Sequence, residues 1–101
     1  MARFEEHVRR ALDSLPPRIA AALENVAVVV EDENPAEPDL LGLFDQEPYQ
    51  PARIAIYRRP LEEDFGDDPA RLEEEIRVTV LHELAHYFGI EEGRLDELGY
   101  G

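Results

Sequence analysis

The stretch PARLEEEIRVTVLHELAHYFG, residues 69–89, carries the clearest structural signal in this 101-residue chain. Its apolar side chains recur at every fourth position, which predicts one face of an α-helix. The recurring residues are Leu72, Ile76, Val80, Leu84 and Phe88. Asp67 or Asp68 can cap the start of this helix, Pro69 suits its first turn, and Gly89 can end it. Further apolar residues in its second half predict that the helix is buried.

Four polar side chains share the gap that remains on the buried half of this helix: Thr79, His82, Glu83 and His86. His82 and His86 stand one turn apart on the same face, so their imidazoles can converge on one metal ion. Glu83 lies next to His82 around the helix, where it can contact a metal-bound water. This spacing is typical of zinc metalloproteases, in which the ion activates the water and the glutamate is the general base.

Chance is a weak explanation for this motif, because a shuffled chain of the same composition contains the bare pattern with a probability on the order of 1%. The alternative interpretation is a pair of satisfied core histidines, or a pair that faces solvent. The burial predicted for the helix favours the metal site over both.

A zinc site usually needs a third protein ligand, and carboxylates follow the helix. Glu92 lies six residues after His86 and three after Gly89. That is the third-ligand position in the metzincin pattern His-Glu-x-x-His-x-x-Gly-x-x-His, and zinc accepts carboxylate oxygen. Asp96, one turn further on, is the alternative ligand if a final helix lies across the site.

Before residue 69, the sequence predicts two helices near the N-terminus. Residues 3–15 have apolar side chains at helical spacing until Pro16 and Pro17 stop the run, and residues 18–26 predict a short second helix or turn. His7, the only other histidine, stands in the first helix beside two glutamates, and we expect it at the surface.

Three further segments predict a small mixed β-sheet of about three strands. Residues 26–32 are β-branched and uninterrupted, which indicates a buried strand. Residues 39–45 form a short apolar segment that suits a strand or a strand edge. Residues 53–57 alternate, with Ile54 and Ile56 on one face, as in a half-buried strand. With a short final helix at 91–98, the fold class is α+β, in one domain over residues 1–101.

Charge and composition exclude several classes of partner and site. The net charge is −14, from 24 acidic residues against 10 arginines, so nucleic acid phosphates and anionic lipid would repel the chain. The absence of cysteine excludes a disulfide framework, a thiolate zinc site and a cysteine nucleophile. No segment has the pattern of a secretory signal or is apolar enough to cross a membrane. We therefore expect a cytoplasmic protein with neither a nucleic acid nor a membrane partner.

The chain resembles the small bacterial zincin-like metallopeptidases, which have a minimal zincin fold. The resemblance rests on residues 54–60, on the block 78–90 that holds the His-Glu-x-x-His motif, and on residues 94–100. It implies a zinc-binding His-Glu-x-x-His-x-x-Gly-x-x-Asp motif. In that motif His82, His86 and Glu92 are the metal ligands and Glu83 is the catalytic base. Glu92 is one methylene longer than the aspartate that is usual there.

The resemblance also implies a function. We expect a zinc-dependent metallopeptidase that hydrolyses peptide bonds in a peptide or protein substrate. The alternative is a catalytically weak or inactive zincin-like domain that binds metal and acts as an interaction module. In zincins an edge strand beside the active-site helix pairs with extended substrate, and the resemblance gives that role to residues 53–57.

Overall fold

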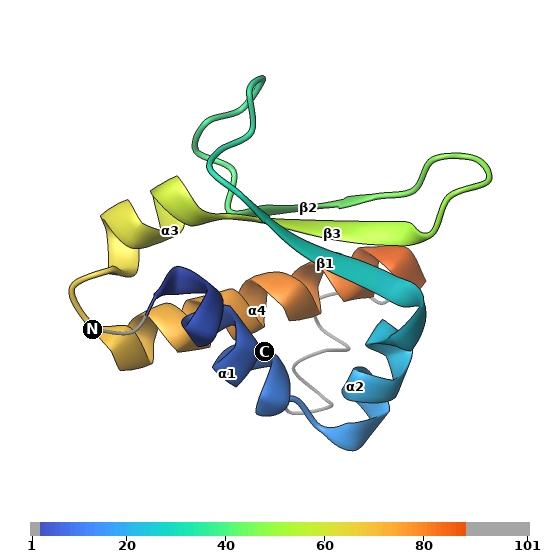
Figure 1. Cartoon of the computed structure of the whole chain (residues 1–101), viewed down its shortest axis with the longest axis horizontal. Coiled ribbons are helices and arrows are strands. Elements are labelled where there is room, and N and C mark those ends of the chain that lie inside the picture. The colour runs from blue at the N-terminus through green and yellow to red at the C-terminus, as the bar shows by residue number, and fades with distance from the viewer. Residues whose placement is uncertain (1–2, 89–101) are drawn as a thin grey trace.

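A three-stranded sheet lies above a long helix, and shorter helices pack around them (Figure 1). The computed structural model describes residues 3–88, and the side chains of residues 3–86. The elements in chain order are α1 (Phe4–Asp13), α2 (Pro17–Ala22), the 3₁₀ turn η1 (Leu23–Asn25), β1 (Val26–Glu31), β2 (Gly42–Asp45), β3 (Ala52–Tyr57), α3 (Arg58–Phe65) and α4 (Pro69–Phe88). This order confirms the predicted α+β class and the small mixed sheet. The predicted final helix at 91–98 lies outside the described residues.

The strand order in the sheet is β1-β3-β2. β1 runs parallel to β3, with Val26 opposite Ala52, and β2 runs antiparallel to β3, with Gly42 opposite Ile56. β3 is therefore the central strand, and the prediction that residues 53–57 form an exposed edge is wrong. Among residues 3–88, β1 and β2 are the outer strands of this sheet.

The alternation in β3 was misleading because both faces of this strand are covered. Ile54 and Ile56 face the helices, while Ala55 and Tyr57 are also buried. The connection between β1 and β2 contacts this second face at Tyr57. Within it, Asn34 donates a hydrogen bond to the Tyr57 hydroxyl at 3.0 Å.

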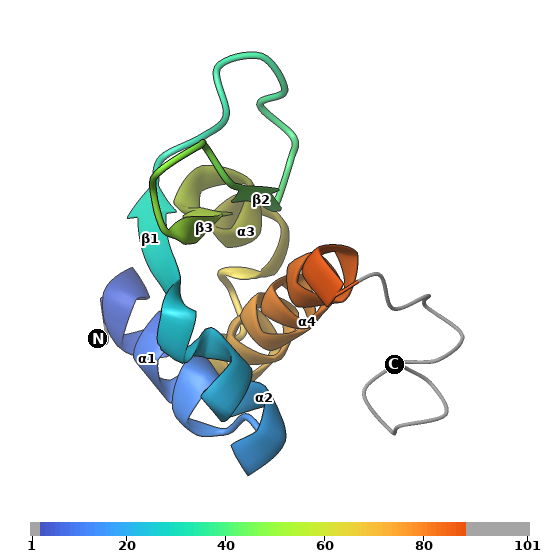
Figure 2. The same cartoon turned by 90° about the vertical axis from the view of Figure 1, so that its right-hand side faces the viewer.

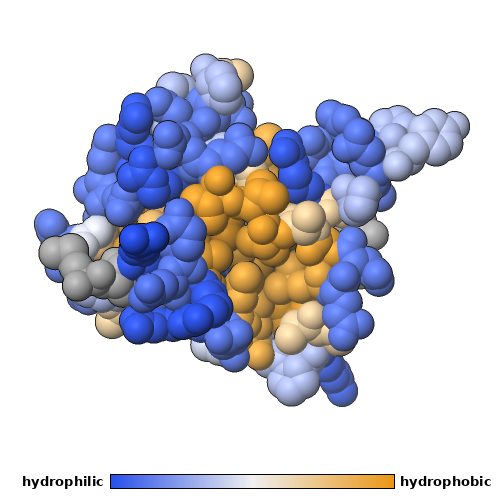
Figure 3. Space-filling view, in the orientation of Figure 1, coloured by the Kyte–Doolittle hydropathy of each residue, from blue (hydrophilic) through white to orange (hydrophobic). Residues whose placement is uncertain are grey.

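β1 corresponds to the strand predicted at 26–32, but it is less buried than its sequence indicates. Val26 is buried, whereas residues 28–30 are half-buried. The reason is the position of β1 at the edge of the sheet. In the orientation of Figure 1, an apolar surface remains visible between β1, α1 and α2 (Figure 3).

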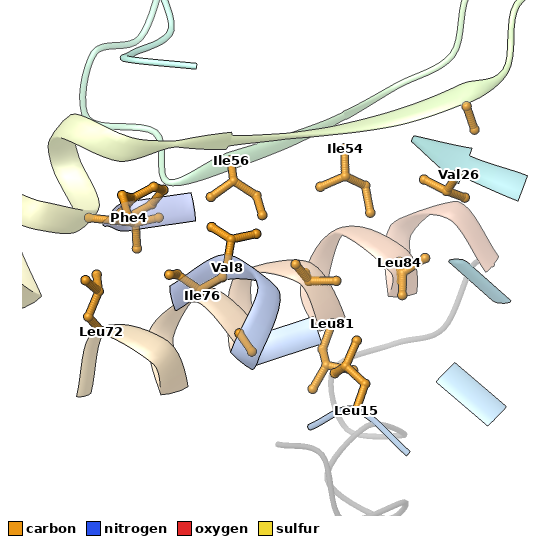
Figure 4. Packing of buried hydrophobic residues seen from close by; sticks show 14 residues of the cluster. Phe4, Val8, Leu15, Val26, Ile54, Ile56, Leu72, Ile76, Leu81 and Leu84 are labelled. Atoms are coloured by element: carbon orange, nitrogen blue, oxygen red, sulfur yellow. The ribbon is translucent and has the colours of Figure 1, made fainter. Parts of the chain in front are cut away.

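The core lies between the sheet and the helices α1 and α4. Ile54 and Ile56 point down from β3 towards Ile76 and Leu81 of α4, with Val8 of α1 beside them (Figure 4). The four β3 and α4 side chains are almost completely buried. Burying such aliphatic side chains stabilises the fold by about 1.5–3 kcal/mol each.

The helix α4 begins as the sequence predicts. The Asp68 carboxylate accepts hydrogen bonds from the backbone N–H groups of Ala70 and Arg71, at 3.1 and 3.3 Å. Asp68 is therefore the N-cap, and Pro69 is the first helical residue. Between residues 3 and 88, no helix is long and apolar enough to span a bilayer.

His7 is buried, so the prediction that it lies at the surface is wrong. Its Nδ1 lies 2.5 Å from Glu73 Oε2 on α4, and Arg10 lies 3.6 Å from the same oxygen. The residue is buried because α1 packs along the first half of α4. This pairing gives His7 a structural partner far from His82 and His86.

Candidate metal centre

The His-Glu-x-x-His motif occupies the last two turns of α4, which passes beneath the edge strand β2. Viewed along the strands, α4 lies on the β2 side of the sheet (Figure 2). Gly42, the first residue of β2, makes this approach possible. A Cβ atom at Gly42 would lie 2.5 Å from Thr79 Cγ2 and 3.1 Å from the Ala55 carbonyl oxygen. Only glycine leaves room for the helix at this distance from the strand.

Glu83 spans the gap between the helix and the strand. Its Oε1 accepts a hydrogen bond from the backbone N–H of Phe44 at 2.7 Å. The strand register explains why this N–H is available. The Tyr57 N–H donates to the Leu41 carbonyl, which makes Gly42 and Phe44 the positions of β2 whose backbone groups face away from β3. Glu83 is therefore bonded to the edge of β2 that faces away from β3.

The two histidines of the motif remain available for a ligand. His86 is exposed, with 69% of its side chain accessible, and its Nδ1 lies 3.8 Å from Glu83 Oε2. His82 is half-buried, and its imidazole has no hydrogen-bond or ion-pair partner within the described part of the chain. Neither side chain is thus a core histidine satisfied by a described residue.

Thr79, the fourth polar residue of the gap, is buried, and its hydroxyl donates to the Glu75 carbonyl oxygen at 2.8 Å. That bond occupies its only donor. Thr79 also contributes a packing surface, through the methyl group that faces Gly42.

The described residues supply two of the protein ligands that a zinc site needs. Two imidazoles one helical turn apart are nitrogen donors of the kind that zinc prefers, and neither is consumed by a described partner. Between residues 3 and 88, no group of three or more His, Cys, Asp or Glu side chains is placed to hold an ion. The predicted third ligand Glu92 and its alternative Asp96 lie outside the described residues. His82 and His86 therefore fit a zinc ion that takes its remaining ligands from elsewhere.

A shallow pocket of about 300 Å³ lies directly beside this site. Residues 39–42 line it from the sheet side, and Thr79, His82 and Glu83 line it from α4. Sequence analysis found the motif residues but missed Gly42 and the Phe44 N–H. A glycine inside a strand can mark a close approach of another backbone or side chain, and that is the signal that points to Gly42.

The comparison with known protein families agrees with the geometry. The model of the zincin-like metallopeptidase family matches residues 23–101, which include β1, β2, β3 and the whole of α4. No curated protein matches the chain significantly. The family match covers well over half of the chain, and the described fold is that of a minimal zincin-like domain. The chain belongs to the zincin-like metallopeptidase family.

Proposed function

We propose that the protein is a zinc-dependent metallopeptidase in which His82, His86 and Glu92 hold the metal and Glu83 is the general base. The observation that best supports this function is the position of Glu83. Its carboxylate lies between the backbone of β2 and the His86 imidazole, beside an open pocket. An extended peptide on that edge would have its backbone next to a base and two metal-binding nitrogens.

The chemistry divides between the metal and the carboxylate. When bound, zinc polarises a carbonyl and lowers the pKa of a water molecule towards about 7. Glu83 accepts a proton from the attacking water and passes it to the leaving amine. Because Oε1 holds the Phe44 N–H, we assign the proton transfer to Oε2, the oxygen that faces His86.

The substrate would bind at β2, not at residues 53–57, because β3 is central and both of its edges are paired. A peptide can add to the free edge of a sheet through main-chain hydrogen bonds. Gly42 shares the orientation of Phe44 in β2, so its backbone N–H and carbonyl also point away from β3. The N–H is the donor and the carbonyl oxygen the acceptor that we propose for an incoming peptide strand.

Metal content is the first test. The purified protein is expected to hold about one zinc ion per chain by elemental analysis at neutral pH, and His86→Ala is expected to abolish binding. Glu83→Gln serves as the matched control, because it changes the motif without removing a proposed ligand, and it should retain the metal. A wild-type chain that binds no zinc would refute the proposal.

Activity is the second test. A peptide library is digested with the wild type and with Glu83→Gln, and only the wild type is expected to cleave it. If both are equally inactive against every substrate while zinc stays bound, the alternative gains support: a metal-binding interaction module of the same family.

The third ligand has its own test. Glu92→Gln is expected to weaken zinc binding much more than Asp96→Asn does, as measured by competition with a chromophoric chelator. The reverse order would transfer the role to Asp96.

A further inference from the structure

The pocket beside Glu83 has apolar walls and an acidic mouth. Leu40, Leu41 and Gly42 form one wall, and the Thr79 methyl group lies opposite, against Gly42. With a volume of about 300 Å³, the pocket is at the lower end of ligand-site sizes, which suits one side chain better than a cofactor.

The charged group at the mouth is Asp39. It is exposed, it lines the pocket, and its carboxylate has no hydrogen-bond or ion-pair partner among residues 3–88. Glu83 supplies a second carboxylate, and none of the arginines between residues 3 and 88 lines the pocket. Most of the described arginines are occupied elsewhere in ion pairs with acidic residues, such as Arg58 with Asp32. The pocket therefore presents uncompensated negative charge above an apolar surface.

We infer that this pocket binds a basic side chain of the substrate, arginine or lysine, with its aliphatic stem on Leu40 and Leu41 and its cationic head at Asp39. Long basic side chains bury their methylene groups along apolar surface and keep the charge at the rim. The net charge of −14 adds a long-range attraction for a cationic peptide. This inference rests on the proposed function only in taking the ligand to be a substrate.

A metal ion would not reverse the charge that the basic residue meets. The pocket is lined by Thr79, His82 and Glu83 but not by His86, so it extends towards the start of α4. A zinc ion shared by His82 and His86 would lie towards the end of that helix. Along β2, Gly42 lies against Thr79 and Phe44 is bonded to Glu83, so the chain before Gly42, which includes Asp39, leads away from His86.

The first experiment measures binding without turnover. Metal-free protein is titrated with acetyl-Ala-Arg-Ala-amide and with the same peptide carrying citrulline, a neutral isostere of arginine. The amide signals of Gly42 and Thr79 are followed by NMR. The arginine peptide is expected to bind about three- to fivefold more tightly, as a partly exposed ion pair allows, and the preference should fall in 0.5 M NaCl.

Two variants with the same net charge make this test specific. Asp39→Asn is expected to remove the preference for arginine. Asp64→Asn removes one carboxylate from the exposed face of α3, away from the pocket, and is expected to keep that preference. Equal binding of the two peptides to the wild type would overturn the inference, as would an equal loss of preference in the two variants.

The second experiment compares cleavage of the same pair of residues, placed in a peptide that the wild type hydrolyses. The ratio of kcat/KM for arginine over citrulline is expected to fall about three- to fivefold in Asp39→Asn and to stay unchanged in Asp64→Asn. Cleavage without this preference would overturn the pocket assignment and leave the peptidase intact. Charge-selective binding with no cleavage of any peptide would overturn the peptidase and leave the assignment.

Discussion

At the scale of single residues, Gly42 sets the distance between α4 and β2. Gly42→Ala would drive a methyl group to within 2.5 Å of Thr79 Cγ2 and 3.1 Å of the Ala55 oxygen, so the helix and strand must separate. Because Glu83 is held at 2.7 Å from the Phe44 N–H, the displacement moves the proposed base. We expect kcat/KM to fall on the order of 100-fold, the effect of a misplacement of about 1 Å, while zinc stays bound.

A second substitution separates this positioning effect from a general loss of stability. Thr79→Ser removes the methyl group that the new alanine would meet and keeps the hydroxyl bonded to Glu75. The double variant Gly42→Ala/Thr79→Ser is expected to recover part of the lost activity. Recovery is incomplete because the Ala55 oxygen still crowds the alanine. A double variant no better than Gly42→Ala alone would show that the contact does not position Glu83.

The residues of the site differ in how far the sequence alone predicts them. His82, Glu83 and His86 could be placed together because their relation is local to one helix, whose period is visible in the sequence. Gly42 could not, since its meeting with Thr79 depends on long-range packing. The prediction for His7 was wrong for the same reason. Its sequence neighbours are acidic, and its partner Glu73 lies 66 residues away.

At the scale of elements, α4 depends on its cap. Asp68→Ala removes the acceptor for two backbone N–H groups in the first turn, and we expect the free energy of unfolding to fall by about 1 kcal/mol. Asp67→Ala is the control, because it removes the same charge one residue earlier and leaves the Asp68 cap intact. Urea denaturation measures both. Equal losses in the two variants would assign the effect to charge near the helix start and not to the cap.

The end of β1 is tied to α3 by an ion pair that titrates. Arg58 donates to Asp32 Oδ1 at 2.7 Å, and this hydrogen bond, together with the positive charge, holds the pKa of Asp32 below its usual value of 3.8. A lowered carboxyl pKa stabilises the folded state above 3.8, and this contribution is lost as the pH falls through the folded-state value.

The lowered pKa of Asp32 determines how the stability of the protein depends on pH. The difference in unfolding free energy between the wild type and Asp32→Asn is expected to be constant from pH 7 to about pH 5 and to shrink at lower pH. A difference that grows on acidification would contradict the role of the pair.

The strands illustrate which part of the fold a sequence reveals. Their positions were predicted because each is a short apolar run, bounded by prolines or charged turns, and the runs of β1 and β3 contain β-branched residues. The order of the strands in the sheet was not predicted. β3 alternates as a half-covered strand would, yet Ala55 and Tyr57 on its second face are also buried, and Asn34 from the 32–41 connection bonds to Tyr57. β1 has the continuous apolar run of a central strand, yet it lies at the edge. Sheet order depends on how the loops cross, which local patterns do not encode.

At the scale of the whole molecule, the core and the proposed metal centre are separate. The largest fully buried side chains come from β3, α3 and α4, and His82, Glu83 and His86 are not among them. The hydrophobic cluster around Ile54, Ile56 and Ile76 therefore does not depend on a bound ion. Small domains that are held together mainly by zinc unfold when the metal is removed. Because the core of this domain is separate from the proposed metal centre, we expect the domain to stay folded when the metal is removed.

Removal of zinc with a chelator is expected to leave the secondary structure intact by circular dichroism and to lower Tm. An ion that binds only the folded state, at 100 times its Kd, adds about 2.7 kcal/mol of stability. For a domain of this size, that corresponds to a shift in Tm of about 10–20 °C. His86→Ala should fold with the lower Tm of the metal-free wild type and show no response to zinc. If chelation unfolded the protein at 25 °C, the ion would be holding the core together, and the separation between core and metal centre would be wrong.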